Sequence, residues 1–361
     1  MKLLLKQNIW RVKPYVPGKP IEEVKREYGL SSVIKLASNE NPFPPSPQVL
    51  AALRTHAKEI NRYPDGDCFY LRQALARRLR VLPQQLIFGN GSDEILVLAL
   101  RALVSDGDEV MVAKPSFLVY GIASQVMGAA LKEVLLKNLR YDLPAMAQAV
   151  TDKTKIIFIG NPDNPAGTYV TAQEVEEFLK AVPSHALVVF DEAYYEFVQK
   201  NDYPDAIGLM RTYENVLVTR TFSKFYGLAG LRVGFGIGHP KLIDGLNRIR
   251  EPFNINSLAQ AAALACLLDI AYYRRMARKI ASQKIFLLTA LRKMGLDCKE
   301  SATNFILIDV KKNSSEVCEQ LLHKGVIIRD MNFWGLENFV RVTVGTNQEN
   351  RRFLAALKGI L

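Results

Sequence analysis

The chain has 361 residues and a formal net charge of +11, with 49% hydrophobic and 23% charged residues. This length suggests two or three domains, and the composition is that of an ordinary globular protein rather than a disordered or fibrous one. The uncharged stretch at residues 253–268 is too short to span a bilayer and contains polar residues, so we predict no membrane segment.

Several functional classes are disfavoured by how the special residues are spaced. The four cysteines lie far apart with no C-x-x-C pair, which favours reduced, packed thiols. The four histidines are equally scattered, so no metal site is expected. The apolar run at residues 3–5 is too short for a signal peptide, and we therefore predict a cytoplasmic protein. No run of five basic residues occurs, so the positive charge favours small anionic ligands over nucleic acid.

Residues 1–40 are irregular and rich in proline, apart from a short helical pattern at residues 21–28. Residues 37–45 contain three prolines, which remove backbone donors and hold the chain extended, so no regular element is expected there. From there to about residue 240, short apolar runs alternate with longer amphipathic segments. The apolar runs cover residues 109–113, 155–159, 186–190 and 215–219.

Near-continuous apolar runs are typical of strands that are covered on both faces. We therefore predict a mostly parallel sheet between layers of helices, which is an α/β architecture. After about residue 245 the pattern changes to a helical stretch at 257–294, strand patterns at 304–308 and 339–344, and a closing helix, which predicts a smaller α+β domain. The expected organisation is an N-terminal arm and part of the small domain (1–40), a large domain (41–245) and a small C-terminal domain (246–361).

Ligands of doubly wound sheets bind at the carboxyl ends of the strands, so polar residues that end each apolar run are the candidates for a site. The first group, residues 88–94, reads Phe-Gly-Asn-Gly-Ser-Asp-Glu and leads into an apolar helical run. Exposed N–H groups near Ser92 and Asp93 at a helix start suit a phosphate, and an ordinary helix cap by either side chain is the alternative. A dinucleotide fingerprint matches less well, because its third glycine is missing.

Two further groups follow predicted strands. In residues 160–168, two Asn/Asp-Pro steps force a rigid turn that holds Asn164 in a defined place, which favours a function over a purely structural turn. Asp191 ends an apolar run, so its carboxylate needs a partner at the sheet edge. Keeping a pyridine nitrogen protonated is one role that fits, since the charged ring then draws electrons from a substrate's α-carbon. A helix cap is the alternative.

The most specific group, residues 219–232, reads Thr-Arg-Thr-Phe-Ser-Lys-Phe-Tyr-Gly-Leu-Ala-Gly-Leu-Arg. A lysine forms a Schiff base with an aldehyde only when its amine is neutral, which burial and nearby cations favour. Lys224 has hydroxyls beside it and small residues after it. Thr221, Ser223 and Arg232 supply donors for an anionic phosphate on the same ligand, so the group favours a phosphate-bearing aldehyde bound to Lys224.

In this order, the four groups resemble those of the fold-type I pyridoxal-phosphate (PLP) aminotransferases. More narrowly, the chain is similar to the histidinol-phosphate aminotransferase family, through residues 14–18, 36–42 and 341–346 as well as the PLP groups. The resemblance covers nearly the whole chain. It implies a PLP-dependent transaminase of histidine biosynthesis, which passes the amino group of histidinol phosphate to 2-oxoglutarate and yields imidazole-acetol phosphate and glutamate.

The resemblance also implies roles for individual residues. Lys224 would bind the cofactor as a Schiff base and shuttle a proton between the substrate's α-carbon and C4′. Asp191 would pair with the pyridinium nitrogen, and Phe117 would stack on the ring. Asn164 and Tyr194 would hydrogen-bond the ring oxygen. Backbone groups at Ser92 and Asp93, together with Thr221, Ser223 and Arg232, would hold the cofactor phosphate.

Histidinol phosphate carries a phosphate but no carboxylate, whereas glutamate and 2-oxoglutarate carry two carboxylates, so one site must accept both anions in turn. Arg329 and Arg341, at the ends of strand-like runs, suit bidentate binding of either anion, with surface ion pairs as the alternative. The resemblance adds Asn39 and Tyr15 to the substrate site, with Tyr15 as a donor to the substrate phosphate. It also implies a homodimer, in which Tyr63 of the partner subunit would reach the cofactor phosphate.

Two positions depart from the family's pattern. Phe117 stands where Tyr is typical, which keeps ring stacking but loses a hydroxyl and leaves the substrate preference open. Asp163 stands beside Asn164 where Asn is commoner. The closest alternative function is an aromatic amino-acid aminotransferase of the same fold, and a threonine-phosphate decarboxylase is a more distant one. A PLP-binding regulator is disfavoured because no helix-turn-helix extension is present, and a basic RNA-binding protein would show no cofactor absorption.

Overall fold

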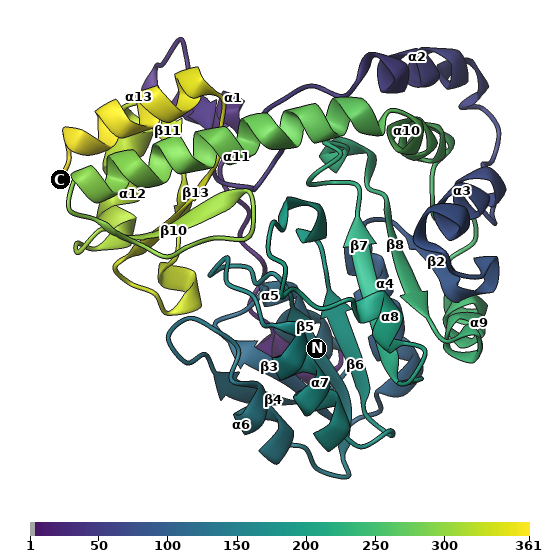
Figure 1. Ribbon diagram of the computed structural model, residues 1–361. Coiled ribbons are helices and arrows are strands. Elements are labelled where there is room, and N and C mark those ends of the chain that lie inside the picture. Colours follow the sequence, from purple (N-terminus) through teal and green to yellow (C-terminus); the bar gives the residue numbers. More distant parts are fainter. Residues whose placement is uncertain (1–3) are drawn as a thin grey trace.

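A computed structural model describes residues 4–361, which form two main sheets with helices packed around them (Figure 1). The larger sheet has seven strands in the order β2-β8-β7-β6-β5-β3-β4. Strand β8 runs in the direction opposite to that of the other six strands. The strands are β2 Leu86–Gly89, β3 Glu109–Lys114, β4 Ala130–Leu135, β5 Thr154–Gly160, β6 Leu187–Asp191, β7 Val216–Thr221 and β8 Gly234–Gly238.

Helices cover both faces of this sheet, because alternate side chains of each strand point to opposite faces. On β5, Ile156 and Phe158 pack with residues of α4, α5 and α9, whereas Ile157 and Ile159 pack with residues of α6 and α7 on the other face. The predicted α/β architecture with a mostly parallel sheet is therefore confirmed. The helices around the sheet are α4 Ser92–Leu103, α5 Leu118–Val126, α6 Leu143–Gln148, α7 Ala172–Ala181, α8 Ala206–Leu209 and α9 Pro240–Ile249.

The smaller sheet has four antiparallel strands in the order β12-β13-β10-β9, and α11 and α13 lie along it (Figure 1). A separate two-stranded parallel pair joins β1, Ile34–Lys35, to β11, Val326–Ile327. A segment near the N-terminus therefore lies beside the C-terminal part of the chain. The remaining elements of this region are α1 Ile21–Tyr28, β9 Asp297–Cys298, β10 Phe305–Asp309, α12 Ser314–His323, β12 Arg329–Asp330, β13 Phe339–Thr343 and α13 Asn347–Lys358.

The helical stretch expected at 257–294 consists of two helices, α10 (Ser257–Leu268) and α11 (Ile270–Lys293). They are separated by Asp269, whose backbone at φ −111° and ψ 44° leaves the helical region. Helix α10 packs against α2 (Pro47–His56) and α3 (Phe69–Leu79), whereas α11 runs along the small sheet. Within residues 4–361, every helix is too short or too polar to serve as a membrane span.

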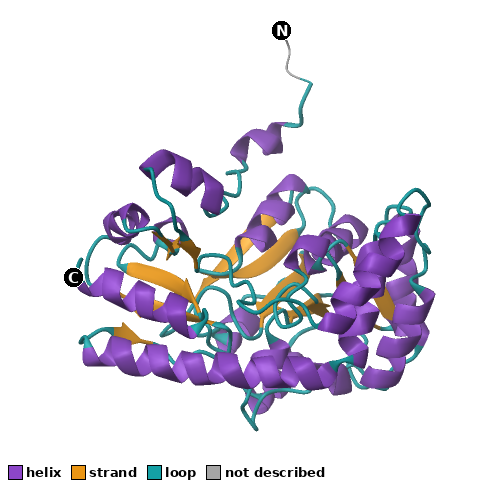
Figure 2. Cartoon of the chain, turned by 90° about the horizontal axis from the view of Figure 1, so that it is seen from above, coloured by secondary structure: helices purple, strands orange, loops and turns teal. Residues whose placement is uncertain are grey.

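At the start of the described chain, residues 4–11 lie on the outside of the body of the molecule (Figure 2). A single 3-10 turn, Gln7–Arg11, lies at the end of α5. The side-chain amide of Asn8 donates to the carbonyl oxygens of Gln125 and Val126 at 2.9 and 3.0 Å. These bonds tie the segment to the last turn of α5.

The sequence pattern does not indicate strand β8, because three of its five residues are glycines, which are depleted in strands. A Cβ atom on Gly234 would collide with the backbone nitrogen of Ser92 and would lie 3.0 Å from the carbonyl oxygen of Arg220. The absence of a side chain therefore lets the first residue of α4 lie directly against the sheet. This close approach fixes the helix start at the sheet's edge, where the candidate site lies.

Candidate active site

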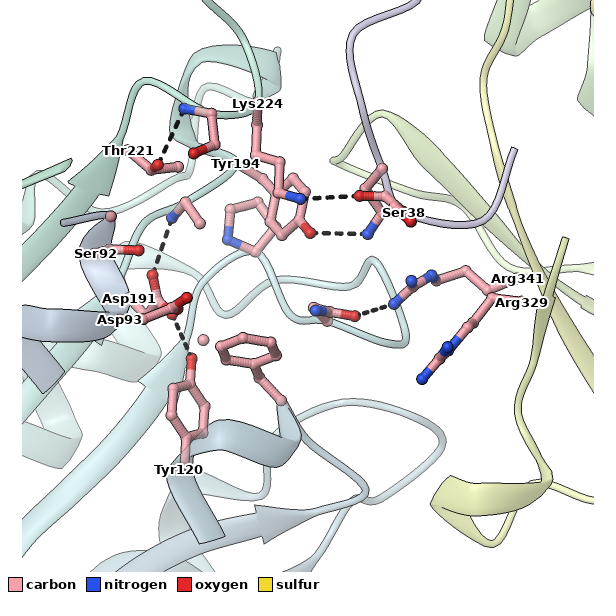
Figure 3. A pocket seen from close by; sticks show the side chains of 18 of the residues that line it. Ser38, Ser92, Asp93, Tyr120, Asp191, Tyr194, Thr221, Lys224, Arg329 and Arg341 are labelled. Carbon is pink, nitrogen blue, oxygen red and sulfur yellow. Dashed lines mark hydrogen bonds between the residues drawn. The ribbon is translucent and has the colours of Figure 1, made fainter. Parts of the chain in front are cut away.

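A cavity that is open to solvent lies between the carboxyl edge of the large sheet and the small sheet (Figure 3). It brings together residues that are far apart in the sequence. With the exception of Tyr63, every residue predicted for the site lines it: Tyr15, Asn39, Ser92, Asp93, Phe117, Asn164, Asp191, Tyr194, Thr221, Ser223, Lys224, Arg232, Arg329 and Arg341. Ser38, Tyr120 and Trp334 also line the cavity, although none of them is among the predicted site residues.

Lys224 lies in the turn that follows β7, where Phe222 and Phe225 on either side are buried in the core. Its amine donates a hydrogen bond of 3.0 Å to the carbonyl oxygen of Ser38 and lies 6.0 Å from the centre of the Tyr194 ring. Burial lowers the pKa of Lys224 to about 8, and the charge of Arg341 adds to this effect. The amine is therefore available in its neutral, nucleophilic form near neutral pH.

Asp191 is the last residue of β6 and is buried. Its carboxylate accepts hydrogen bonds from the Tyr120 hydroxyl at 2.8 Å, the Thr219 hydroxyl at 3.2 Å and the Ala193 backbone at 3.2 Å. Burial raises the pKa of Asp191 to about 6. All three partners are neutral, so the carboxylate suits a cationic ligand group such as a pyridinium nitrogen. The alternative of a helix cap is wrong, because the following 3-10 turn begins after Tyr194.

An anion cradle lies at the start of α4. The N-cap residue is Gly91, with a φ of +79° and no side-chain cap, so the alternative of capping by Ser92 or Asp93 is wrong. The free N–H groups at this helix end point to an anion site. Arg232 lies across from them, donating to the Ser223 hydroxyl at 3.4 Å and to Asp93 at 3.5 Å. The structure thus groups the residues predicted to hold a phosphate.

The middle of the cavity is lined by neutral polar side chains. The Tyr194 hydroxyl accepts a hydrogen bond of 2.8 Å from the side-chain amide of Asn39. The Asn39 backbone adopts φ +56° and donates to the Thr343 hydroxyl at 2.9 Å, which connects the N-terminal segment to the small sheet. The side-chain oxygen of Asn164 accepts from the guanidinium of Arg341. The turn after β5 is therefore held against the small sheet at the point where Asn164 faces the cavity.

Two guanidinium groups extend into the cavity from the small sheet (Figure 3). Arg329 and Arg341 are 8% and 6% exposed, so the alternative of surface ion pairs is wrong. Their hydrogen-bond acceptors within residues 4–361 are neutral: Val16 O for Arg329, and Asn164 Oδ1 and Ala37 O for Arg341. The Nε atoms of both arginines are buried without a partner. Burial lowers the pKa of Arg341 to about 10, and an anionic ligand would offset the cost of burying both charges.

Phe117 and Tyr120 form an aromatic wall of the cavity. Their rings meet edge to face, with centroids 5.4 Å apart, and the Tyr120 hydroxyl reaches Asp191. Tyr120 follows Phe117 by three positions at the start of α5, a spacing that brings side chains to one face of a helix. That spacing is the sequence signal that could have indicated Tyr120 once Phe117 was chosen.

Tyr63 is the one predicted site residue that lies outside the cavity. Its side chain is 83% exposed and stacks on Phe253, with ring centroids 4.8 Å apart. Phe69 and Tyr70 are exposed as well, at 52% and 75%. Exposed aromatic side chains of this kind are typical of a surface that another molecule covers.

The chain matches the model of the family described as aminotransferase class I and II over residues 31–357. The chain belongs to this family. A histidinol-phosphate aminotransferase of Moorella thermoacetica is 48% identical, with 99% of this chain and 92% of the relative covered. A second one, from Nitrosococcus oceani, is 47% identical, with 96% and 94% covered.

Solved structures agree with this assignment. The crystal structure of histidinol-phosphate aminotransferase from Sinorhizobium meliloti in complex with pyridoxal 5′-phosphate has a TM-score of 0.91 to this chain, at 29% identity over 99% of both chains. An aspartate aminotransferase of Thermus thermophilus shares the fold, with a TM-score of 0.86 at 22% identity. The transaminase class, the narrower family resemblance and PLP as the family's cofactor, all stated from the sequence, are confirmed.

The lowered pKa of Lys224 makes a direct prediction about its reactivity. Because acetic anhydride acylates only neutral amines, labelling of Lys224 in the cofactor-free protein should be half-maximal near pH 8. The same peptide in urea-unfolded protein should follow the ordinary lysine value of 10.5. Mass spectrometry of the peptide after brief labelling at a series of pH values measures both curves. Superimposable curves for folded and unfolded protein would show that burial does not activate this amine.

Proposed function

We propose that this protein is a PLP-dependent transaminase that transfers the amino group of histidinol phosphate to 2-oxoglutarate. The observation that carries the proposal is the position of Arg329 and Arg341, two buried cations with neutral partners, in the cavity that also holds Lys224. A phosphate and a carboxylate both suit such a pair, because guanidinium groups bind either anion in a bidentate manner. The names of the relatives at 48% and 47% identity support this donor.

The cavity fits the cofactor at both of its charged ends. Asp191 would pair with the ring nitrogen, and the carboxylate has neutral partners that leave this position to a cation. The start of α4, with Thr221, Ser223 and Arg232, would hold the phosphate. Phe117 would stack on the ring. When bound, PLP withdraws electrons from the α-carbon of the amino donor and so makes its proton removable.

Residues of the chain would carry out proton transfer and substrate binding. Lys224, with a pKa near 8, takes the proton from the α-carbon of the donor. Arg341 and Arg329 hold the anionic group of the substrate. The Tyr15 hydroxyl, from the N-terminal part of the chain, donates a further hydrogen bond to that group. Asn164 and Tyr194 orient the cofactor ring by hydrogen-bonding its ring oxygen. Asn39 fixes Tyr194 through the hydrogen bond to its hydroxyl.

An absorbance titration of the PLP-loaded protein tests the substrate. Low concentrations of histidinol phosphate should convert the cofactor band to the pyridoxamine form, and 2-oxoglutarate should restore it, because the site accepts both anions. Tyrosine and phenylalanine serve as controls for the aromatic aminotransferase alternative. Conversion by the aromatic amino acids but not by histidinol phosphate would refute the donor, while the transaminase chemistry would stand. Release of carbon dioxide from a phosphorylated amino acid would favour a decarboxylase.

We further propose that the active form is a homodimer, in which the partner subunit's Tyr63 completes the cofactor phosphate site. Exposed aromatic side chains at 63, 69 and 70 support a covered surface here, and isologous dimers are the commonest oligomers of soluble proteins. Tyr63 lies outside its own cavity, which is the position expected of a residue that acts on another subunit. The cytoplasmic location stays a prediction from the sequence.

Mixed dimers test whether Tyr63 acts in trans. A heterodimer of one Tyr63→Phe subunit and one Lys224→Ala subunit, isolated through two affinity tags, should have about half the wild-type activity per dimer. The reason is that one of its sites combines an intact Lys224 with an intact Tyr63. If Tyr63 acted within its own subunit, that heterodimer would instead show half the activity of the Tyr63→Phe homodimer. The Lys224→Ala homodimer should show no steady-state transamination.

A further inference from the structure

Trp334 links the small sheet to the aromatic wall of the cavity. It is the last residue of a short 3-10 turn, Asn332–Trp334, between β12 and β13, and is only 7% exposed. Its indole N–H donates a buried hydrogen bond of 2.9 Å to the carbonyl oxygen of Ser116, which directly precedes Phe117. A side chain of the small-sheet region therefore fixes the backbone that carries the aromatic wall.

The face of the same indole supports an anion-binding residue. The guanidinium of Arg329 lies 4.9 Å from the centre of the Trp334 ring, within the range of a cation–π interaction. Within residues 4–361, Arg329 makes one side-chain hydrogen bond, to Val16 O, and its buried Nε has no partner. The Tyr15 ring, at 5.6 Å, is its other aromatic neighbour. The Trp334 ring is thus one of the main contacts that hold the Arg329 guanidinium in place.

Apolar packing holds Trp334 in place from both sides of the cavity. It belongs to a small cluster of buried residues with Ala166, Leu307 and Met331. Ala166 comes from the turn after β5, close to Asn164, whereas Leu307 and Met331 come from the small-sheet region. Since the indole is anchored in this cluster, a change in its position would shift Arg329 and the backbone before Phe117 together.

We propose that Trp334 is a positioning and specificity-determining residue, which sets the distance between Arg329 and the wall at Phe117. This distance then selects amino donors by the separation between their anionic group and their amino-bearing carbon. Trp334 acts through Arg329 and Ser116 and takes no part in the chemistry itself. This inference rests on the proposed function, because it assigns Arg329 to the anionic group of the substrate.

Two substitutions separate the two contacts. Trp334→Phe keeps a ring but removes the N–H donor, and Trp334→Leu removes the ring as well. We expect KM for histidinol phosphate to rise about tenfold in Trp334→Leu and less in Trp334→Phe, with kcat changed less than about threefold. Trp10→Phe is the matched control, since Trp10 is 62% exposed. Urea unfolding of each variant shows whether the fold is intact.

A double-mutant cycle distinguishes positioning from a general loss of packing. In an Arg329→Ala background, Trp334→Leu should add little to the KM for histidinol phosphate, because the residue that the ring positions is gone. A rise in KM that is equally large in both backgrounds would overturn the proposal. So would kinetics of Trp334→Leu that match those of Trp10→Phe, or a loss confined to kcat.

Fluorescence provides a readout that does not depend on turnover. The chain has two tryptophans, so Trp10→Phe leaves Trp334 as the only one. In the PLP-loaded Trp10→Phe protein, inorganic phosphate and histidinol phosphate should each change the tryptophan emission in a saturable way, and Arg329→Ala should abolish the phosphate response. An emission that neither ligand changes would overturn the proposal. If the Trp10→Phe protein shows this phosphate response but does not convert histidinol phosphate, the proposed donor is wrong and the role of Trp334 stands.

Discussion

Arg341 carries a positive charge into the space between the two sheets, where its hydrogen-bond acceptors within residues 4–361 are neutral oxygens. Burying a cation without a carboxylate costs several kcal/mol, and the lowered pKa of this guanidinium reflects that cost. The two acceptors lie outside the small sheet, on Ala37 of the N-terminal segment and on Asn164 of the turn after β5. One side chain therefore joins three parts of the chain and leaves the cavity short of negative charge.

The other charged groups of the cavity show the same shortage of partners of opposite charge. The charge of Arg341 favours the neutral form of the Lys224 amine, in addition to the effect of burial. At the opposite end, the Asp191 carboxylate is buried among neutral donors, and no cation pairs with it in the described part of the chain. The cavity thus has unpaired charges of opposite sign at its two ends and an activated amine as well. A cofactor with a basic ring and a substrate with an anionic group together supply what it lacks.

Much of the fold could be predicted from the sequence, because the buried strands β3, β5, β6 and β7 appear as apolar runs. The three glycines of β8 hide that strand, and two of them, Gly234 and Gly236, serve the close approach of α4 rather than strand formation. Polar residues at or soon after the ends of these runs, among them Asn164, Asp191 and Thr221, indicated the site, because parallel strands present their carboxyl ends at one edge. That rule identifies the edge but does not say which side chains from elsewhere cover it.

The residues that the sequence does not reveal are those that act through long-range contacts. Ser38 accepts from Lys224 across 186 positions, and Trp334 reaches Ser116 across 218. Neither contact leaves a recognisable pattern in the neighbouring sequence, because serine and tryptophan also occur at many positions without such a role. Tyr63 shows the opposite case: its assignment depends on a second subunit, and its exposed position in the single chain agrees with that assignment without testing it.

The most direct test of the anion site is the steady-state kinetics of Arg341→Ala. If this buried cation serves the anionic groups of both substrates, KM for histidinol phosphate and for 2-oxoglutarate should rise together, by on the order of 100-fold. Arg248→Ala, at an exposed arginine paired with Asp244, is the matched control and should leave both values unchanged. Normal KM values for both substrates in a folded, PLP-loaded Arg341→Ala protein would contradict the central role of this residue.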